Sequence, residues 1–158
     1  KYIVLTHGHA DHISGVNEHL DDFPDAKVVV HTNEKPMLED PRANQSLMFG
    51  SAQTVNGDIF VNDGDELEVG NLKLKFIFTP GHTPGGMCIY VESEDVLFSG
   101  DTLFRQSIGR TDFPGGSFRD LADAVHTKLF ILPDETVVLP GHMGQTSIGF
   151  EKGNNPFV

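Results

Sequence analysis

The sequence predicts a fold that mixes β-strands and α-helices, of the α/β or α+β class. Short apolar and β-branched runs alternate along the chain with segments whose apolar residues recur at helical spacing. The length of 158 residues suits one domain, which we expect to span residues 1–158. The single cysteine, Cys88, excludes an internal disulfide framework, and its apolar strand-like surroundings predict a small buried side chain.

The first half of the chain is expected to hold two strands and two helical segments. The run Ile3–Leu5 predicts a buried strand, and the helical spacing of apolar residues over 13–20 predicts a helix after it. The β-branched run Lys27–Val30 predicts a strand that is buried on both faces. A short helix is expected over Asn33–Glu39, followed by a loop with helical turns over Asp40–Asp58.

The second half is expected to hold four strands, at Leu72–Phe78, Met87–Val91, Val96–Ser99 and Thr136–Leu139. The first of these alternates apolar and lysine residues, which predicts a single core face. A glycine-rich loop is expected from Gly100 to Ser117. An amphipathic helix should then run from Phe118 to Phe130, with Ser117 as its N-cap.

The charge balance disfavours a nucleic-acid partner. Eleven Lys and Arg face 23 Asp and Glu, for a net charge of −12, whereas nucleic-acid binding needs a basic surface. No apolar run approaches the ~20 residues that span a bilayer, so no membrane partner is expected. The opening run is too short for a signal-peptide core, and the expected location is the cytoplasm.

Metal-capable side chains follow four predicted strands, at the point where each strand ends. They are His7, His9, Asp11 and His12 after the first strand, and His82, Asp101 and His142 after three later ones. Loops at strand ends commonly present functional side chains, so we expect these seven to converge at one sheet edge. Imidazole is the commonest metal ligand, and seven ligands can hold two ions if one carboxylate is shared.

The segments that carry these residues resemble motifs of the metallo-β-lactamase superfamily. They occur in the same order as in that family and extend over nearly the whole chain, at Thr6–His12, Gly81–Gly85, Ser99–Phe104 and Leu139–His142. The stretch Gly109–Gly116 and the closing Asn155–Phe157 are most similar to its compact glyoxalase II-like (hydroxyacylglutathione hydrolase-like) branch. The resemblance implies a four-layer αβ/βα sandwich with its metals at one edge. The family has several strands before its first histidine motif. We therefore expect this chain to lack N-terminal strands and its parent protein to be longer.

The resemblance also implies a binuclear metallohydrolase. One divalent ion would lie on His7, His9 and His82, a second on Asp11, His12 and His142, with Asp101 bridging them. Zinc is the expected metal, with iron and manganese as alternatives. Two cations lower the pKa of a bound water towards ~7, and the resulting hydroxide would attack a small-molecule thioester such as a hydroxyacylglutathione. Asp11 and Asp101 are the expected catalytic carboxylates.

Other interpretations of the same residues stay open. Arg110 is a candidate substrate-binding residue that would contact a substrate carboxylate, or it forms an internal ion pair with Asp112. An iron-dependent persulfide dioxygenase would hold one iron through residues at the positions of His7, His82 and Asp101, and would act on glutathione persulfide. A metal-binding module without turnover is the alternative from another class.

Overall fold

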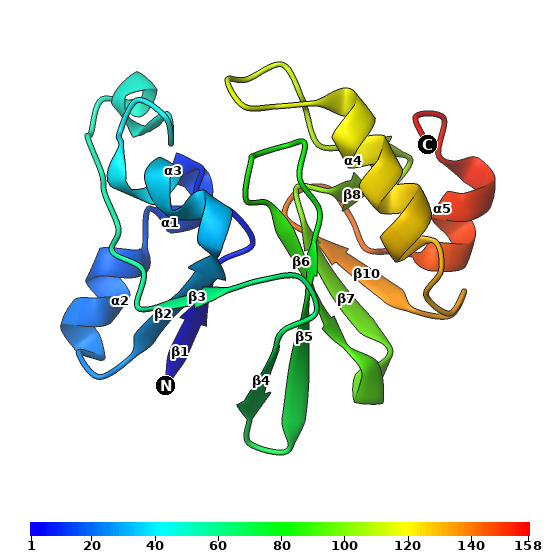
Figure 1. Cartoon of the computed structure of the whole chain (residues 1–158), viewed down its shortest axis with the longest axis horizontal. Helices are drawn as coiled ribbons and strands as arrows, with labels where there is room; N and C mark the ends of the chain where they lie inside the picture. The colour runs from blue at the N-terminus through cyan, green and yellow to red at the C-terminus, as the bar shows by residue number, and fades with distance from the viewer.

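The computed structural model describes residues 1–158 as four layers, in which helices cover the outer faces of two stacked sheets (Figure 1). One sheet has three strands in the order β1-β2-β3. The other has six strands in the order β11-β10-β7-β6-β5-β4. The predicted four-layer α/β sandwich is therefore confirmed.

The three-stranded sheet is entirely parallel, so each connection between its strands crosses over the sheet. Its strands are β1 (Tyr2–Val4), β2 (Lys27–His31) and β3 (Ile59–Val61). The crossovers carry α1 (Ala10–Ile13), α2 (Val16–Asp22), η1 (Thr32–Glu34), α3 (Lys35–Glu39) and η2 (Ser46–Phe49). As predicted, the middle strand β2 is buried on both faces.

The six-stranded sheet is antiparallel except where β7 and β10 pair in parallel. Its strands are β4 (Glu66–Val69), β5 (Leu72–Phe78), β6 (Met87–Val91), β7 (Val96–Gly100), β10 (Val137–Pro140) and β11 (Thr146–Ser147). Its outer face carries α4 (Phe118–Ala124), the π-helical segment η4 (Val125–Leu129) and α5 (Ile148–Asn154). A short turn η3 (Glu92–Glu94) joins β6 to β7, and a hairpin of β8 (Leu103–Phe104) and β9 (Ser107–Ile108) follows β7.

Three separate hydrophobic clusters fill the spaces between the four layers. Val29, Phe76 and Ile89 belong to the cluster that both sheets share. A second cluster lies between the three-stranded sheet and its helices and includes Val28 and Val30, the strand neighbours of Val29. The third joins the six-stranded sheet to η4 and α5. Successive side chains of a strand point to opposite faces, so each sheet contributes to two clusters.

Several predicted elements differ in detail from the structure. The single core face expected for Leu72–Phe78 is wrong, because Ile77 packs on the helix side while Phe76 faces the other sheet. The helix predicted over 13–20 begins earlier and is divided into α1 and α2, with Gly15 between them, the poorest helix former after proline. The helix predicted over Phe118–Phe130 changes to π-helical geometry at Val125, although Ser117 caps its N-terminus as expected.

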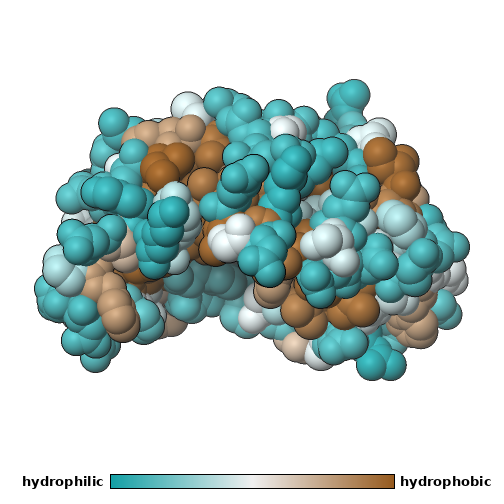
Figure 2. All heavy atoms as spheres, turned by 90° about the horizontal axis from the view of Figure 1, so that it is seen from below, coloured by the Kyte–Doolittle hydropathy of each residue, from teal (hydrophilic) through white to brown (hydrophobic).

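No helix in the structure has the length and hydrophobicity that crossing a bilayer would require. The face seen in Figure 2 is mostly hydrophilic, with separate hydrophobic patches, and is hollowed between its two halves.

Cys88 on β6 is expected to be unreactive while the protein is folded. Its side chain is fully buried, and burial raises the pKa of the thiol to about 11, so thiolate is scarce at pH 8. Labelling by a chromogenic disulfide reagent should be at least ~100-fold slower in the native protein than in guanidinium, where one thiol per chain should react. Rapid labelling of the folded protein would contradict this burial.

Candidate metal centre

The four segments that carry metal-capable side chains meet because of how their strands run. Strands β5, β7 and β10 point in the same direction in the six-stranded sheet, so their carboxyl ends share one edge. His82 follows β5, Asp101 follows β7 directly, and His142 follows β10. His7 and His9 lie on the loop after β1 of the other sheet, and α1 begins there. The centre therefore lies where the two sheets open at one edge.

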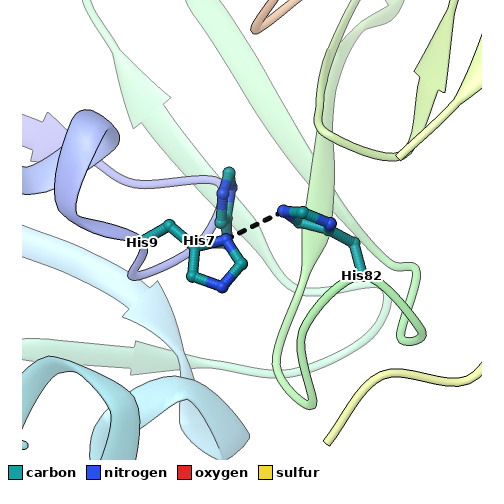
Figure 3. Close-up of side chains that lie close together, drawn as sticks. All are labelled: His7, His9 and His82. Carbon is teal, nitrogen blue, oxygen red and sulfur yellow. Dashed lines mark hydrogen bonds between the residues drawn. The ribbon is translucent and has the colours of Figure 1, made fainter. Parts of the chain in front are cut away.

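The first group of candidate ligands brings together side chains from both sheets. His7, His9 and His82 each offer a ring nitrogen, and these nitrogens lie within 4.8 Å of one another. Figure 3 shows His7 and His9 on one loop facing His82 on the other. The Nδ1 atom of His9 and the Nε2 atom of His82 are 2.9 Å apart. These are three of the predicted ligands, and all three are buried.

The second group consists of Asp11, His12 and His142, whose ligand atoms also lie within 4.8 Å of one another. Asp11 and His12 occupy the first turn of α1, and His142 reaches them from the end of β10. The Nε2 atom of His142 is 3.1 Å from Oδ2 of Asp11. This group is more exposed to solvent than the first, since the side chains of Asp11 and His142 are each about half exposed.

Asp101 lies between the two groups. Its Oδ2 atom is 3.5 Å from Nε2 of His82 in the first group and 3.5 Å from Nε2 of His142 in the second. Its Oδ1 atom is 3.3 Å from Nε2 of His12. The structure thus brings all seven predicted residues together, with this carboxylate in contact distance of both groups.

The hydrogen bonding of these residues fits a bound cation. The Nε2 atom of His7 is buried and has no hydrogen-bond partner, and the buried Nε2 atom of His12 and Oδ1 atom of Asp101 have none beyond their mutual contact at 3.3 Å. Buried polar atoms without partners are rare, and metal coordination is one way of satisfying them. The other ring nitrogen of His82 is held by the carbonyl oxygen of Arg110, 2.7 Å from Nδ1, a contact of the kind that orients histidine ligands.

The protonation of the first group suits metal binding. Burial, with the neighbouring imidazoles, lowers the pKa of His7 well below its usual value and that of His9 to about 4. The pKa of His82 is also lowered, chiefly by burial. Neutral imidazole is the form that binds metals, so at neutral pH these three rings need not lose a proton first.

Two glycines allow the strand ends to approach one another closely around Asp101. A Cβ atom on Gly141 would lie 2.4 Å from Oδ1 of Asp101 and 2.7 Å from Cε1 of His12. A Cβ atom on Gly109 would lie 1.8 Å from the carbonyl oxygen of Asp101. All three distances are far below van der Waals contact, so glycine at these two positions is what leaves room for the backbone and carboxylate of Asp101.

A cleft of about 440 Å³ opens beside the candidate ligands. Its walls include His9, Asp11, His82, Asp101 and His142, the apolar side chains of Phe49, Phe104, Ile108, Phe113 and Met143, and one cation, Arg110. The Nε and Nη2 atoms of Arg110 donate to the two carboxylate oxygens of Asp112 at 2.8 and 2.7 Å. Its guanidinium also stacks on Phe113, 3.6 Å from the ring centroid. The predicted internal ion pair is therefore present.

The sequence prediction missed one buried charged residue beside the centre, Glu34 at the end of η1. Its carboxylate accepts hydrogen bonds from the backbone N–H groups of Gly8 and Gly85, one on each ligand loop. Nothing in the local sequence distinguished this residue from a solvent-exposed glutamate, because its partners lie 26 and 51 residues away.

Comparison with known proteins agrees with this geometry. A family model described as the metallo-beta-lactamase superfamily matches residues 1–142. A probable metallo-hydrolase of Bacillus subtilis, YqgX, is 40% identical over 99% of this chain and 74% of its own length. The hydroxyacylglutathione hydrolase GloC of Haemophilus influenzae is 35% identical over 100% of this chain and 76% of its own. The chain thus spans about three quarters of these relatives.

Solved structures that are similar to this chain include three with high TM-scores. The B3 metallo-beta-lactamase BLEG-1 superposes with a TM-score of 0.92 at 42% identity, over 99% of this chain and 76% of that one. A di-iron-bound form of TTHA1623 superposes with a TM-score of 0.86 at 32% identity, over 99% and 77%. ETHE1 from Myxococcus xanthus gives a TM-score of 0.80 at 34% identity, over 99% and 61%.

Proposed function

The chain belongs to the metallo-beta-lactamase superfamily, and from this premise we propose that it is a binuclear hydrolase of small-molecule thioesters of the hydroxyacylglutathione type. The observation that carries the proposal is the position of Asp101 between two groups of three candidate ligands. The superfamily binds two metal ions, and this arrangement provides for two. The hydrolase GloC, similar over the whole chain, supports the thioester class.

The seven side chains would be divided between two metal sites. His7, His9 and His82 would hold one ion, and Asp11, His12 and His142 the other, with Asp101 shared. When bound, two divalent ions supply an activated water and polarise the substrate carbonyl. Zinc is the proposed metal on its preference for imidazole ligands, and iron is the competing candidate because TTHA1623 has a di-iron form.

The chain's own residues would receive and orient the thioester. The cleft has the volume of a small-molecule site, and its apolar walls would exclude water from the acyl group. In the reaction, water adds to the carbonyl carbon, the C–S bond breaks, and the products are a thiol and a carboxylic acid. Asp11, half exposed in the cleft beside His142, is the proposed residue for moving protons to and from solvent.

Arg110 would contact an anionic group of the substrate without breaking its ion pair. A guanidinium has five N–H donors, and Asp112 uses two of them. Replacement of Arg110 by Gln should raise KM about tenfold and leave kcat within about twofold, the pattern for lost ground-state binding. Arg105→Gln is the matched control, because Arg105 is not among the cleft walls and its guanidinium lies over the ring of Phe150. An equal change in both variants would contradict the proposed contact.

The proposed function is tested by assaying two substrates beside a metal analysis of the same preparation. We expect close to two metal ions per chain and hydrolysis of a hydroxyacylglutathione, with no oxygen uptake on glutathione persulfide. One iron per chain with oxygen uptake on the persulfide would replace the hydrolase by a dioxygenase. Full metal occupancy without turnover of either substrate would refute thioester hydrolysis and favour a binding module.

A further inference from the structure

We propose that Glu34 is a positioning residue, which holds the His7–His9 loop and the His82 loop at the separation that one metal ion requires. The inference rests on the metal centre of the proposed function, and it does not depend on which substrate is cleaved. Glu34 is not among the candidate ligands, and it would act through the two loops that carry three of them.

The carboxylate of Glu34 bridges the two loops through both of its oxygens. Its Oε1 atom accepts a hydrogen bond of 2.8 Å from the N–H of Gly8, which lies between His7 and His9. Its Oε2 atom accepts one of 2.7 Å from the N–H of Gly85, three residues after His82. One loop follows a strand of the three-stranded sheet and the other a strand of the six-stranded sheet, so a single side chain ties the two halves together.

The surrounding backbone is built to admit this carboxylate. A Cβ atom on Gly85 would lie 2.3 Å from the backbone nitrogen of Glu34 and 2.6 Å from its Oε2. A Cβ atom on Gly8 would approach Leu38 to 3.1 Å and Oε1 of Glu34 to 3.4 Å. The absence of a side chain at position 85 is therefore what lets the loop N–H reach the oxygen.

The charge of Glu34 supplies a second reason for an effect on metal binding. The side chain is fully buried, and the partners of its two oxygens are backbone N–H groups rather than a lysine or arginine. A buried carboxylate without a cationic partner is costly. A dication held by the adjoining loops would offset that cost, so the negative charge should favour cation binding there.

Glu151 offers a matched control within the same chain. It is equally buried, and it also accepts hydrogen bonds through both oxygens, from the N–H of Gln106, the amide of Asn155 and the hydroxyl of Thr146. These bonds tie α5 to the β8–β9 hairpin and to β11, and none reaches a ligand loop. Glu151→Gln therefore measures what losing a buried bridging carboxylate does to the fold alone.

The test is the zinc affinity of Glu34→Gln, Glu151→Gln and the unchanged protein, measured by competition with a chromophoric chelator. Glutamine keeps the shape but turns an NH₂ group towards one of the two loop N–H donors. We expect Glu34→Gln to weaken one of two zinc sites by about 10–100-fold, the usual effect of losing a residue that orients ligands. Glu151→Gln should keep both affinities within about threefold. Equal zinc affinities in the two variants would overturn the proposal.

A second measurement uses the unchanged protein and so does not require a folded variant. One equivalent of zinc should slow hydrogen exchange at the amides of Gly8 and Gly85 together, because both are bonded to the same carboxylate. Slowing at only one of them, or at neither, would overturn the proposal. Zinc binding with this behaviour but without thioester turnover would refute the proposed function alone. Failure to bind zinc, iron or manganese would refute both.

Discussion

Replacement of Asp101 by Ala is expected to reduce kcat/KM by about 10³-fold or more and to lower the metal content at both sites. Asp101 is the one carboxylate within 3.5 Å of histidines from both ligand groups. Its loss removes a ligand from each proposed ion and leaves the imidazoles without their shared counter-charge. A loss of ~4 kcal/mol in transition-state stabilisation corresponds to this factor.

The measurement is metal analysis and steady-state kinetics on the same preparation, with Asp123→Ala as the control. Asp123 is exposed on α4 and makes only a long ion pair with Arg119, so its removal should change neither quantity. Full occupancy of two metal ions in Asp101→Ala would refute the bridging role. The fold should survive the substitution, because the side chain contacts histidines of the centre rather than a hydrophobic cluster.

Replacement of Gly109 by Ala is expected to damage both stability and activity. The new Cβ atom would lie 1.8 Å from the carbonyl oxygen of Asp101 and 3.2 Å from Cγ of His82, so backbone must move. Overpacking of this kind costs about 3 kcal/mol, which for a chain of this length lowers Tm by roughly 6–12 °C. Since Asp101 moves with its carbonyl, kcat should fall about 10²-fold.

The control for this substitution is Gly153→Ala, read by thermal unfolding and kinetics. Gly153 lies in α5 and a Cβ atom there would meet nothing within 4 Å. Alanine is the better helix former by about 1 kcal/mol, so Tm should stay constant or rise slightly, and activity should be unchanged. If Gly109→Ala kept the stability and activity of Gly153→Ala, the close packing around Asp101 would be disproved.

The positions of the candidate ligands could be predicted because each one follows an apolar run closely. A run such as Val96–Ser99 specifies a strand by itself, and Asp101 follows it by two residues. What brings Asp101 to His142 is the parallel pairing of β7 with β10, which the structure shows and the sequence analysis did not predict. The four-layer arrangement came from the resemblance, since local patterns define strands but not their neighbours.

The elements that the sequence prediction missed depend on contacts made elsewhere in the chain. Strand β4 has alternating charged residues with two apolar ones, and it is stabilised by pairing with β5 across a tight turn. The β8–β9 hairpin lies in a glycine-rich stretch and is held by Glu151 of α5 and by Asn155, which directly follows that helix. Glu34 was missed for the same reason, because its burial depends on distant glycines.

The candidate ligands come from both sheets, so metal binding would also affect the stability of the folded chain. With Cys88 as its only cysteine, this chain has no internal disulfide, yet His7 and His82 lie on loops that follow strands of different sheets, and His142 follows a strand much later in the sequence. Metal ions bound by ligands from several of these loops would act as reversible cross-links between parts of the chain that are far apart in sequence. Such cross-linking penalises the unfolded ensemble, and it would make resistance to heat depend on the free metal concentration.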